Sequence, residues 1–168
     1  MMLAPRFFTL DDAGCEALLA GHQVGRMAFT FRNRVDIVPV HYVYRDRWIY
    51  GRLEYGAKTE VLSHHPWVAF EVDAVRALFD WESVVVHGRV AFPEADGPPA
   101  EQARHTRAVE LIRTLIPGAF TEADPTPSRG LVFVLPVTEW TGRAARHEAP
   151  ETSAAGVTAQ ASTGQGAP

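Results

Sequence analysis

The sequence contains only one cysteine, Cys15, and only one lysine, Lys58, among its 168 residues. A single cysteine excludes an internal disulfide framework and a cysteine-based zinc finger. No apolar run approaches the roughly 18 residues that a membrane-spanning helix needs. The segment Met1–Leu10 lacks the charged and apolar regions of a signal peptide. These absences predict a cytoplasmic protein with no membrane partner.

An excess of positive charge is also missing. The 16 Lys and Arg residues are outnumbered by 20 Asp and Glu residues, and the formal net charge is −4. Nucleic-acid binding is not expected, because it needs a basic surface. No metal site is expected either, because His64 and His65 have no further ligand at a useful spacing. The nine Phe, four Trp and four Tyr residues supply enough apolar material for one core.

The composition divides the chain into a body and a tail. Residues 147–168 contain no aromatic side chain, and Val157 is their only large aliphatic one. Such a segment buries too little apolar surface to offset the entropy lost on ordering. We therefore expect one folded domain over residues 1–146 and a disordered or loosely ordered tail over residues 147–168.

Hydrophobic periodicity within the body predicts six strands and three helices. Helices are expected from a cap at Thr9 to Gly21, over Ala57–Ser63, and from Pro98 to a stop at Pro117. The expected strands are Val24–Phe31, Val35–Tyr44, Trp48–Leu53, Trp67–Asp73, Ser83–Phe92 and Gly130–Trp140. This order predicts an α+β domain, a six-stranded, mostly antiparallel barrel with flanking helices. Pro39 and Pro136 within strands place those positions at edges or bulges, so the barrel is expected to be interrupted.

The strand Val35–Tyr44 is apolar on both of its faces. One face carries Val38, Val40, Tyr42 and Tyr44, and the other carries Val35, Ile37, Pro39 and Val43. A barrel interior covers one face, and the other needs a different cover, because monomers rarely expose large apolar patches. We therefore predict a two-fold homodimer.

The segment Gly51–Thr59 carries the strongest chemical signal. A strand ends, the chain turns at Gly56, and a helix begins beside Lys58. A lysine in the first turn opposes the helix dipole unless an anion binds there, in which case backbone N–H groups and the ammonium hold it together. Arg52, at the end of the same strand, could add a second charge. The alternative is a solvated lysine in an ordinary turn.

Six segments together resemble one known family. They are Gly25–Thr30, Ile37–Tyr42, Gly56–Lys58, Val68–Asp73, Trp81–Arg89 and Trp140–Arg143. In this order and spacing they resemble the flavin-binding split-barrel proteins related to pyridoxamine 5′-phosphate oxidase. No single segment is specific, but the resemblance extends from Leu10 to Arg143.

The resemblance implies a homodimer with two FMN sites at the subunit interface. Lys58 matches the phosphate-binding lysine, with Gly56 and Ala57 in the same turn. The other implied cofactor-binding positions are Val38, Pro39 and Val40 along the isoalloxazine ring, Arg52 and Leu53 at the ribityl chain or ring edge, Trp81 and Ser83 at the start of a strand, and Trp140 from the second subunit.

Three departures narrow the implied activity. Pyridoxamine phosphate oxidase carries an Arg-Lys pair where this chain has Ala57 and Lys58, and its arginine-rich C-terminal motif is absent from Glu139–Arg146. Oxidation of pyridoxamine phosphate is therefore not expected. The nitroimidazole-resistance branch resembles the chain more closely, but Gly51 stands where that branch has a histidine. Leu53 replaces a small polar residue of many relatives.

The function expected from the resemblance is an FMN-dependent oxidoreductase that takes electrons from a nicotinamide donor and passes them to an unidentified small molecule. In such enzymes the cofactor carries the redox chemistry, so no catalytic side chain is required, and none is assigned. Two alternatives remain open: a non-catalytic split-barrel module that binds flavin or haem, and a deazaflavin-dependent reductase.

Overall fold

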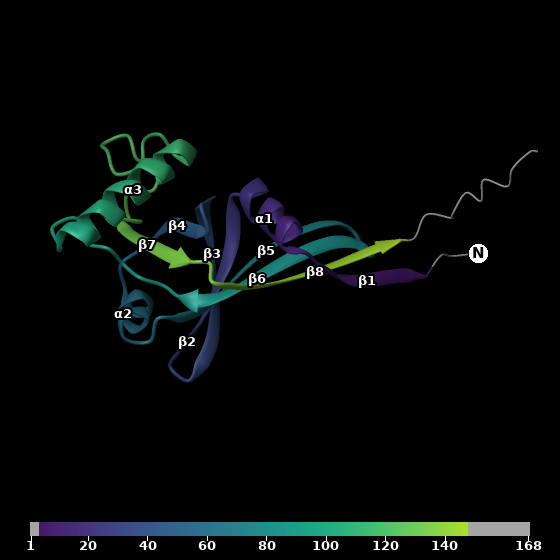
Figure 1. Ribbon diagram of the computed structural model, residues 1–168. Helices are drawn as coiled ribbons and strands as arrows, with labels where there is room; N and C mark the ends of the chain where they lie inside the picture. Colours follow the sequence, from purple (N-terminus) through teal and green to yellow (C-terminus); the bar gives the residue numbers. More distant parts are fainter. Residues whose placement is uncertain (1–3, 148–168) are drawn as a thin grey trace, which may run out of the picture.

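Eight strands form one antiparallel sheet, and three helices pack on it (Figure 1). The structure, a computed structural model, describes residues 4–147. Of the predicted tail over residues 147–168, His147 is the last residue of a strand, and residues 148–168 lie outside the described residues. The strands are β1 (Pro5–Leu10), β2 (Val24–Phe31), β3 (Arg34–Arg45), β4 (Trp48–Leu53), β5 (Trp67–Ala77), β6 (Asp80–Arg89), β7 (Leu131–Pro136) and β8 (Glu139–His147), and the helices are α1 (Asp12–Gly21), α2 (Ala57–His64) and α3 (Pro99–Leu115).

The prediction of six strands is wrong, and the two strands that were not predicted, β1 and β8, were missed for different reasons. The segment Gly130–Trp140 was expected as one strand, but β7 ends at Pro136 and β8 begins at Glu139. Proline has no N–H with which to continue the ladder. β1 escaped detection because its apolar side chains are exposed, Phe7 by 65% and Phe8 by 43%, so the strand shows no alternation.

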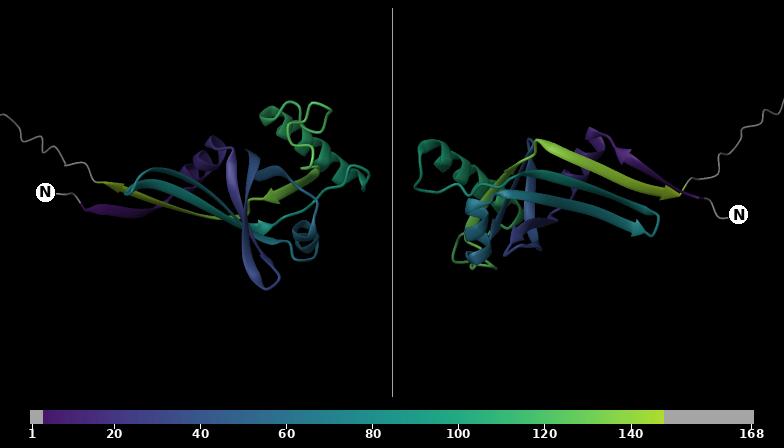
Figure 2. Two further views of the ribbon diagram at one scale, coloured as in Figure 1. Left: turned by 180° about the vertical axis from the view of Figure 1, so that it is seen from behind. Right: turned by 90° about the horizontal axis from the view of Figure 1, so that it is seen from below.

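The strand order is β1-β8-β6-β5-β2-β3-β4-β7. A single bridge brings β7 back to the chain just after β6: Ala91 and Val134 exchange two backbone hydrogen bonds of 2.9 Å. The strands from β2 to β7 thus form a barrel that is open elsewhere. β5, β6, β8 and β1 extend beyond this barrel as a long sheet, as the views in Figures 1 and 2 show.

Both strand prolines lie at edges, as predicted. Pro39 is in the first half of β3, which pairs with β2 alone, because pairing with β4 starts at Tyr42. Pro136 is the last residue of β7, the terminal strand of the sheet order. Neither position interrupts a central ladder.

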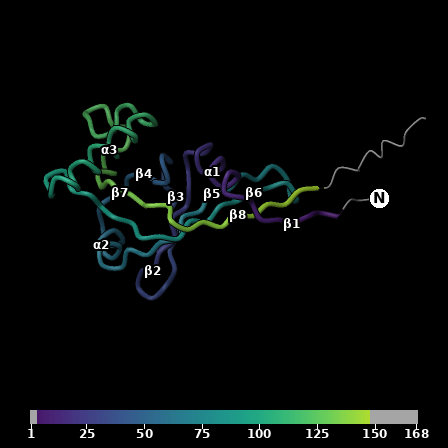
Figure 3. The backbone as a smooth tube through the Cα atoms, in the orientation of Figure 1, coloured from purple at the N-terminus to yellow at the C-terminus, as the bar shows by residue number. Residues whose placement is uncertain are grey.

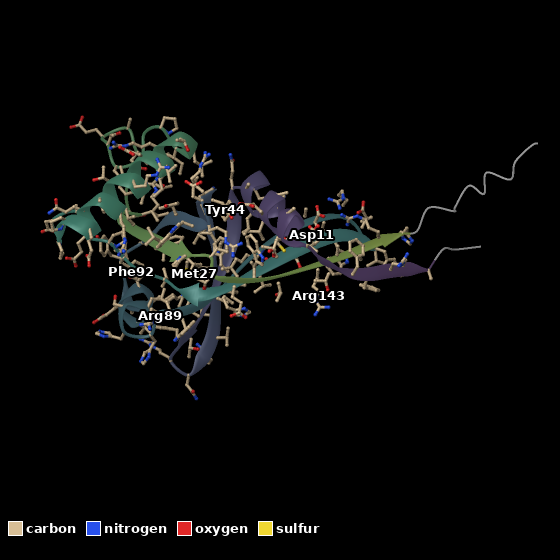
Figure 4. The ribbon with its side chains drawn as sticks, in the orientation of Figure 1. Asp11, Met27, Tyr44, Arg89, Phe92 and Arg143 are labelled. Atoms are coloured by element: carbon tan, nitrogen blue, oxygen red, sulfur yellow. The ribbon has the colours of Figure 1, made fainter. Side chains whose placement is uncertain are left out.

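The barrel core is aromatic. Tyr42, Phe70 and Phe133 are fully buried, and the rings of Tyr42 and Phe70 meet edge to face at 5.1 Å. The Tyr42 hydroxyl donates to the Leu19 carbonyl oxygen at 2.7 Å, which ties α1 to the barrel. Burial raises the pKa of Tyr42 well above its usual value. The labelled Met27 and Tyr44 in Figure 4 lie in the middle of the molecule.

The inner face of helix α1 carries the buried side chains of Cys15, Leu18 and Leu19. Its cap is Asp11, not Thr9: the Asp11 carboxylate accepts from the Gly14 N–H at 2.8 Å, and Thr9 belongs to β1. Burial raises the pKa of the Cys15 thiol. A buried thiol with a raised pKa is a packing residue rather than a nucleophile.

The outer face of the first half of β3 is uncovered in the described chain. Val35 is 78% exposed and Ile37 57%, whereas Val40 and Tyr42 lie in the core. Of the helices, α1 contacts β6, β8, β3, β5 and β1, α3 contacts β4, β7 and β3, and α2 contacts β2. These contacts leave Val35 and Ile37 exposed. The tube in Figure 3 follows this arrangement, with α2 beside the barrel and α3 over β7.

Candidate functional site

A cavity of about 240 Å³ lies where α2, β3 and β4 meet. Four of the positions singled out in the sequence line it: Val38, Pro39, Leu53 and Lys58. The other lining residues are Phe29, Glu54, Thr59, Leu62 and Arg129. We call this space the Lys58 cavity. It combines an apolar wall from β2, β3 and β4 with charged groups near the start of α2.

The turn between β4 and α2 positions Lys58. Gly56 is the N-cap of α2, and its N–H donates to Thr59 Oγ1 at 3.0 Å. The Thr59 hydroxyl in turn donates to the Gly56 carbonyl oxygen at 2.9 Å. Ala57 and Lys58 occupy the first turn, where backbone N–H groups have no partner within the helix. This geometry favours an anion.

Lys58 has a counter-ion that the sequence analysis did not identify. Its Nζ lies 2.7 Å from Asp36 Oδ2 on β3, and the two side chains are 49% and 34% exposed. The hydrogen bond from Lys58 lowers the pKa of Asp36. An exposed pair of this kind contributes little to stability, so an anion with more donors around it can replace the Asp36 carboxylate.

The charges at the Lys58 cavity balance. Lys58 and Arg129 are positive, and Glu54 and Asp36 are negative. The resting cavity therefore carries no large positive field, and the placement of its donors matters more than its net charge.

The Arg52 side chain does not line the Lys58 cavity and instead forms a buried ion pair with Asp124. Its side chain is 3% exposed, and Nη1 and Nη2 donate to the Asp124 carboxylate at 2.5 and 2.9 Å. Nη2 also donates to Thr126 Oγ1 at 2.7 Å, and the guanidinium stacks on Phe120 at 5.1 Å. Asp124 belongs to the loop between α3 and β7. Arg52 thus fixes that loop on the face of β4 opposite to Leu53.

Three further positions from the sequence analysis lie outside the Lys58 cavity. Trp81, in β6, contacts the ring of Phe7 with a centroid separation of 6.2 Å. Ser83 pairs with Asp73 on β5. The Trp140 Nε1–H donates to Asp12 Oδ1 at 2.8 Å, and the Arg47 guanidinium lies 3.9 Å from its ring.

The remaining positions lie near the cavity without contributing to its lining. Val40 is in the core, 2% exposed, one residue beyond Pro39. Gly56 and Ala57 form the turn before Lys58. Farther along the sheet, Glu71 on β5 forms an ion pair with Arg26 on β2 at 3.0 Å. Burial raises the pKa of Glu71 despite this partner.

Within residues 4–147, no cluster of three or more His, Cys, Asp or Glu side chains could hold a metal ion. In the same part of the chain, no helix has the length and apolar character needed to cross a membrane.

The profile of the family described as pyridoxamine 5′-phosphate oxidase matches residues 11–144, which include every strand except β1 and the end of β8. The chain belongs to the pyridoxamine 5′-phosphate oxidase family. The resemblance seen in the six sequence segments is thereby confirmed. No curated protein matches the chain by sequence.

Solved structures of related proteins share the family fold. An FAD-binding protein from Mesorhizobium loti superposes with a TM-score of 0.63 at 24% identity, covering 82% of this chain and 96% of that one. A proposed 5-nitroimidazole antibiotic resistance protein from Bacteroides thetaiotaomicron gives 0.61 at 19% identity, with 85% and 90% covered. An FAD and haem binding protein from Mycobacterium smegmatis gives 0.57 at 15%, with 82% and 72% covered. At these identities the likeness concerns the fold.

Proposed function

We propose that the chain is a flavin-dependent oxidoreductase whose Lys58 cavity holds the flavin mononucleotide part of the cofactor. The observation that carries this proposal is the position of the only lysine, in the first turn of α2 beside an apolar wall. Membership of the family supports it, as do the flavin-binding relatives of the same fold.

The residues of the Lys58 cavity fit the two halves of such a ligand. Lys58, Arg129 and the first-turn N–H groups of α2 suit a phosphate, and Phe29, Val38 and Pro39 suit a flat aromatic ring. The cavity volume, about 240 Å³, is below the range of about 300–1,000 Å³ usual for small-molecule sites. One chain therefore encloses only part of the ligand.

We further propose that a second copy of the chain completes the site. Val35, Ile37 and Pro39 are exposed on the strand that also lines the Lys58 cavity, so a partner on this face would cover both. Trp81, Ser83 and Trp140, which lie outside the cavity in one chain, are candidates for contact with the partner's flavin.

When bound, the flavin supplies the redox chemistry, and the chain's residues supply binding and placement. The electron donor consistent with this role is a nicotinamide nucleotide, and the acceptor is a small molecule. The FAD and haem binding relative favours a second candidate, a binding module without turnover. Bleaching of the bound flavin by NADH or NADPH, with recovery on adding an acceptor, supports the oxidoreductase. A bound flavin that neither nucleotide bleaches supports the binding module without turnover. Tighter binding of a deazaflavin than of FMN supports a deazaflavin-dependent reductase.

Replacing Lys58 by alanine should weaken FMN binding by about 10- to 100-fold, because one charge-assisted hydrogen bond to the phosphate is lost. Quenching of flavin fluorescence measures the affinity. Arg45→Ala removes an exposed cation outside the cavity and is the matched control. Asp36→Asn, which frees the Lys58 ammonium, should bind FMN at least as tightly as the wild type. Unchanged affinity in Lys58→Ala would remove the phosphate assignment.

The purified protein should have the mass of a dimer at micromolar concentration, measured by light scattering. Ile37→Lys places a charge on the exposed face of β3 and should shift the mass toward the monomer, because a buried unpaired charge is costly. Arg34→Lys, which keeps the charge at the first residue of β3, is the control. A wild-type monomer would contradict both the dimer and the shared flavin site.

A further inference from the structure

A second and larger cavity lies on the other side of the α2 N-terminus. Its volume is about 680 Å³, within the range of about 300–1,000 Å³ of small-molecule sites. The lining residues are Tyr55, Gly56, Thr59, Glu60, Ser63, Phe92, Pro93, Glu94, Ala95, Asp96, His105, Gly130, Leu131 and Val132. We call it the Tyr55 cavity. The proposed function gives it no role.

The two cavities meet at one turn of the chain. Thr59 lines both of them, and the consecutive residues Glu54 and Tyr55 line the Lys58 cavity and the Tyr55 cavity respectively. In the same way, Arg129 lines the Lys58 cavity and the next residue, Gly130, lines the Tyr55 cavity. A ligand that passes over the turn between β4 and α2 can therefore occupy both cavities, with its middle at the first-turn N–H groups of α2.

The lining of the Tyr55 cavity suits a neutral ligand that donates hydrogen bonds. The carboxylates of Glu60, Glu94 and Asp96 are acceptors, and they disfavour a phosphate inside the cavity. Sugar hydroxyls and an exocyclic amine are donors that match them, as an acidic residue matches ribose in dinucleotide sites. The phosphates of the same ligand belong outside, beside Lys58 and Arg129.

Tyr55 supplies a surface for an aromatic base. Its side chain is 69% exposed, and its ring lies over the backbone of Gly130, where an added Cβ would be 3.5 Å from Tyr55 Cε2. Bases stack on such exposed rings without sequence-specific contacts.

We propose that the Tyr55 cavity is the subsite for the adenosine half of a dinucleotide whose diphosphate crosses the α2 N-terminus. This inference rests on the proposed function, because the other half of the dinucleotide is the flavin in the Lys58 cavity. FAD is the source that fills both cavities. NADH carries the same adenosine diphosphate and is the other source of this chemistry.

The test compares the affinities of FAD, FMN, ADP and NADH for the purified protein, by fluorescence and calorimetry. FAD should bind at least about tenfold more tightly than FMN, the gain expected from one stacked base. Tyr55→Ala should remove this advantage and weaken ADP binding, and leave FMN affinity unchanged. Tyr55→Phe, which keeps the ring, should behave as the wild type.

The outcomes separate the subsite from the proposed function. If FAD and FMN bind equally, and Tyr55→Ala weakens ADP and NADH instead, the subsite stands and its adenosine comes from the electron donor. If Tyr55→Ala changes the affinity of none of the four ligands, the subsite is overturned, and FMN binding alone would keep the proposed function. If neither flavin binds but ADP binds through Tyr55, the proposed flavin function fails and the adenosine subsite remains.

Discussion

Arg52→Met should lower the free energy of unfolding by about 3–5 kcal/mol, the usual cost of removing one partner of a buried ion pair. The methionine fills most of the space but leaves the Asp124 carboxylate, 4% exposed, without its cation. Urea titration followed by circular dichroism measures the loss. Arg45→Met, at an exposed position, should change stability by less than about 0.5 kcal/mol.

The same variant should alter the acid sensitivity of the fold. The hydrogen bonds from Arg52 hold the pKa of Asp124 well below its ordinary value. A lowered folded-state pKa contributes stability above the unfolded-state value of about 4, and this contribution is lost as pH falls below it. The stability gap between wild type and Arg52→Met should therefore narrow below about pH 4. A gap that stays constant to low pH would contradict the role given to this ion pair.

Phe133→Ala should also lower the free energy of unfolding by about 3–5 kcal/mol, because a fully buried ring in β7 is lost and a cavity remains. Thermal denaturation measures the effect. Phe7→Ala, at a position that is 65% exposed, is the control and should cost much less.

Phe133 also explains why residue 51 is a glycine. A Cβ at Gly51 would lie 2.5 Å from two atoms of the Phe133 ring and 2.8 Å from the His41 carbonyl oxygen. Gly51→Ala should therefore be destabilising by about 1–3 kcal/mol in the wild type and by less in the Phe133→Ala background. Additive effects of the two substitutions would exclude this contact. A histidine at residue 51, as in the nitroimidazole-resistance branch, does not fit while the Phe133 ring is in place.

The sequence predicted the strands of the barrel well, because turn residues separate them. The strand Val24–Phe31 has its predicted bounds, and so does Trp48–Leu53, since turn residues flank both. The two hairpin turns have positive φ at Asn33 and Asp46, 60° and 51°, as is usual for two-residue turns between antiparallel strands. β1 gave no signal, because an edge strand with exposed aromatic side chains does not alternate.

The candidate site was predicted less completely. Successive residues of a strand point to opposite faces, so Arg52 and Leu53 project from opposite faces of β4. The structure shows this arrangement: Leu53 lines the Lys58 cavity, and Arg52 forms an ion pair with Asp124. Asp36 could not be found in this way, because its contact with Lys58 depends on how α2 packs beside β3.

The half-exposed Lys58 side chain has a practical consequence. The sequence offers a single ε-amine to acylating reagents, and that amine is 49% exposed and lines the Lys58 cavity. An amine-reactive reagent therefore modifies one lysine position, and mass spectrometry of the peptides after digestion locates the adduct at Lys58. A ligand whose phosphate binds Lys58 shields the amine, so the extent of Lys58 modification reports how much of the cavity is occupied.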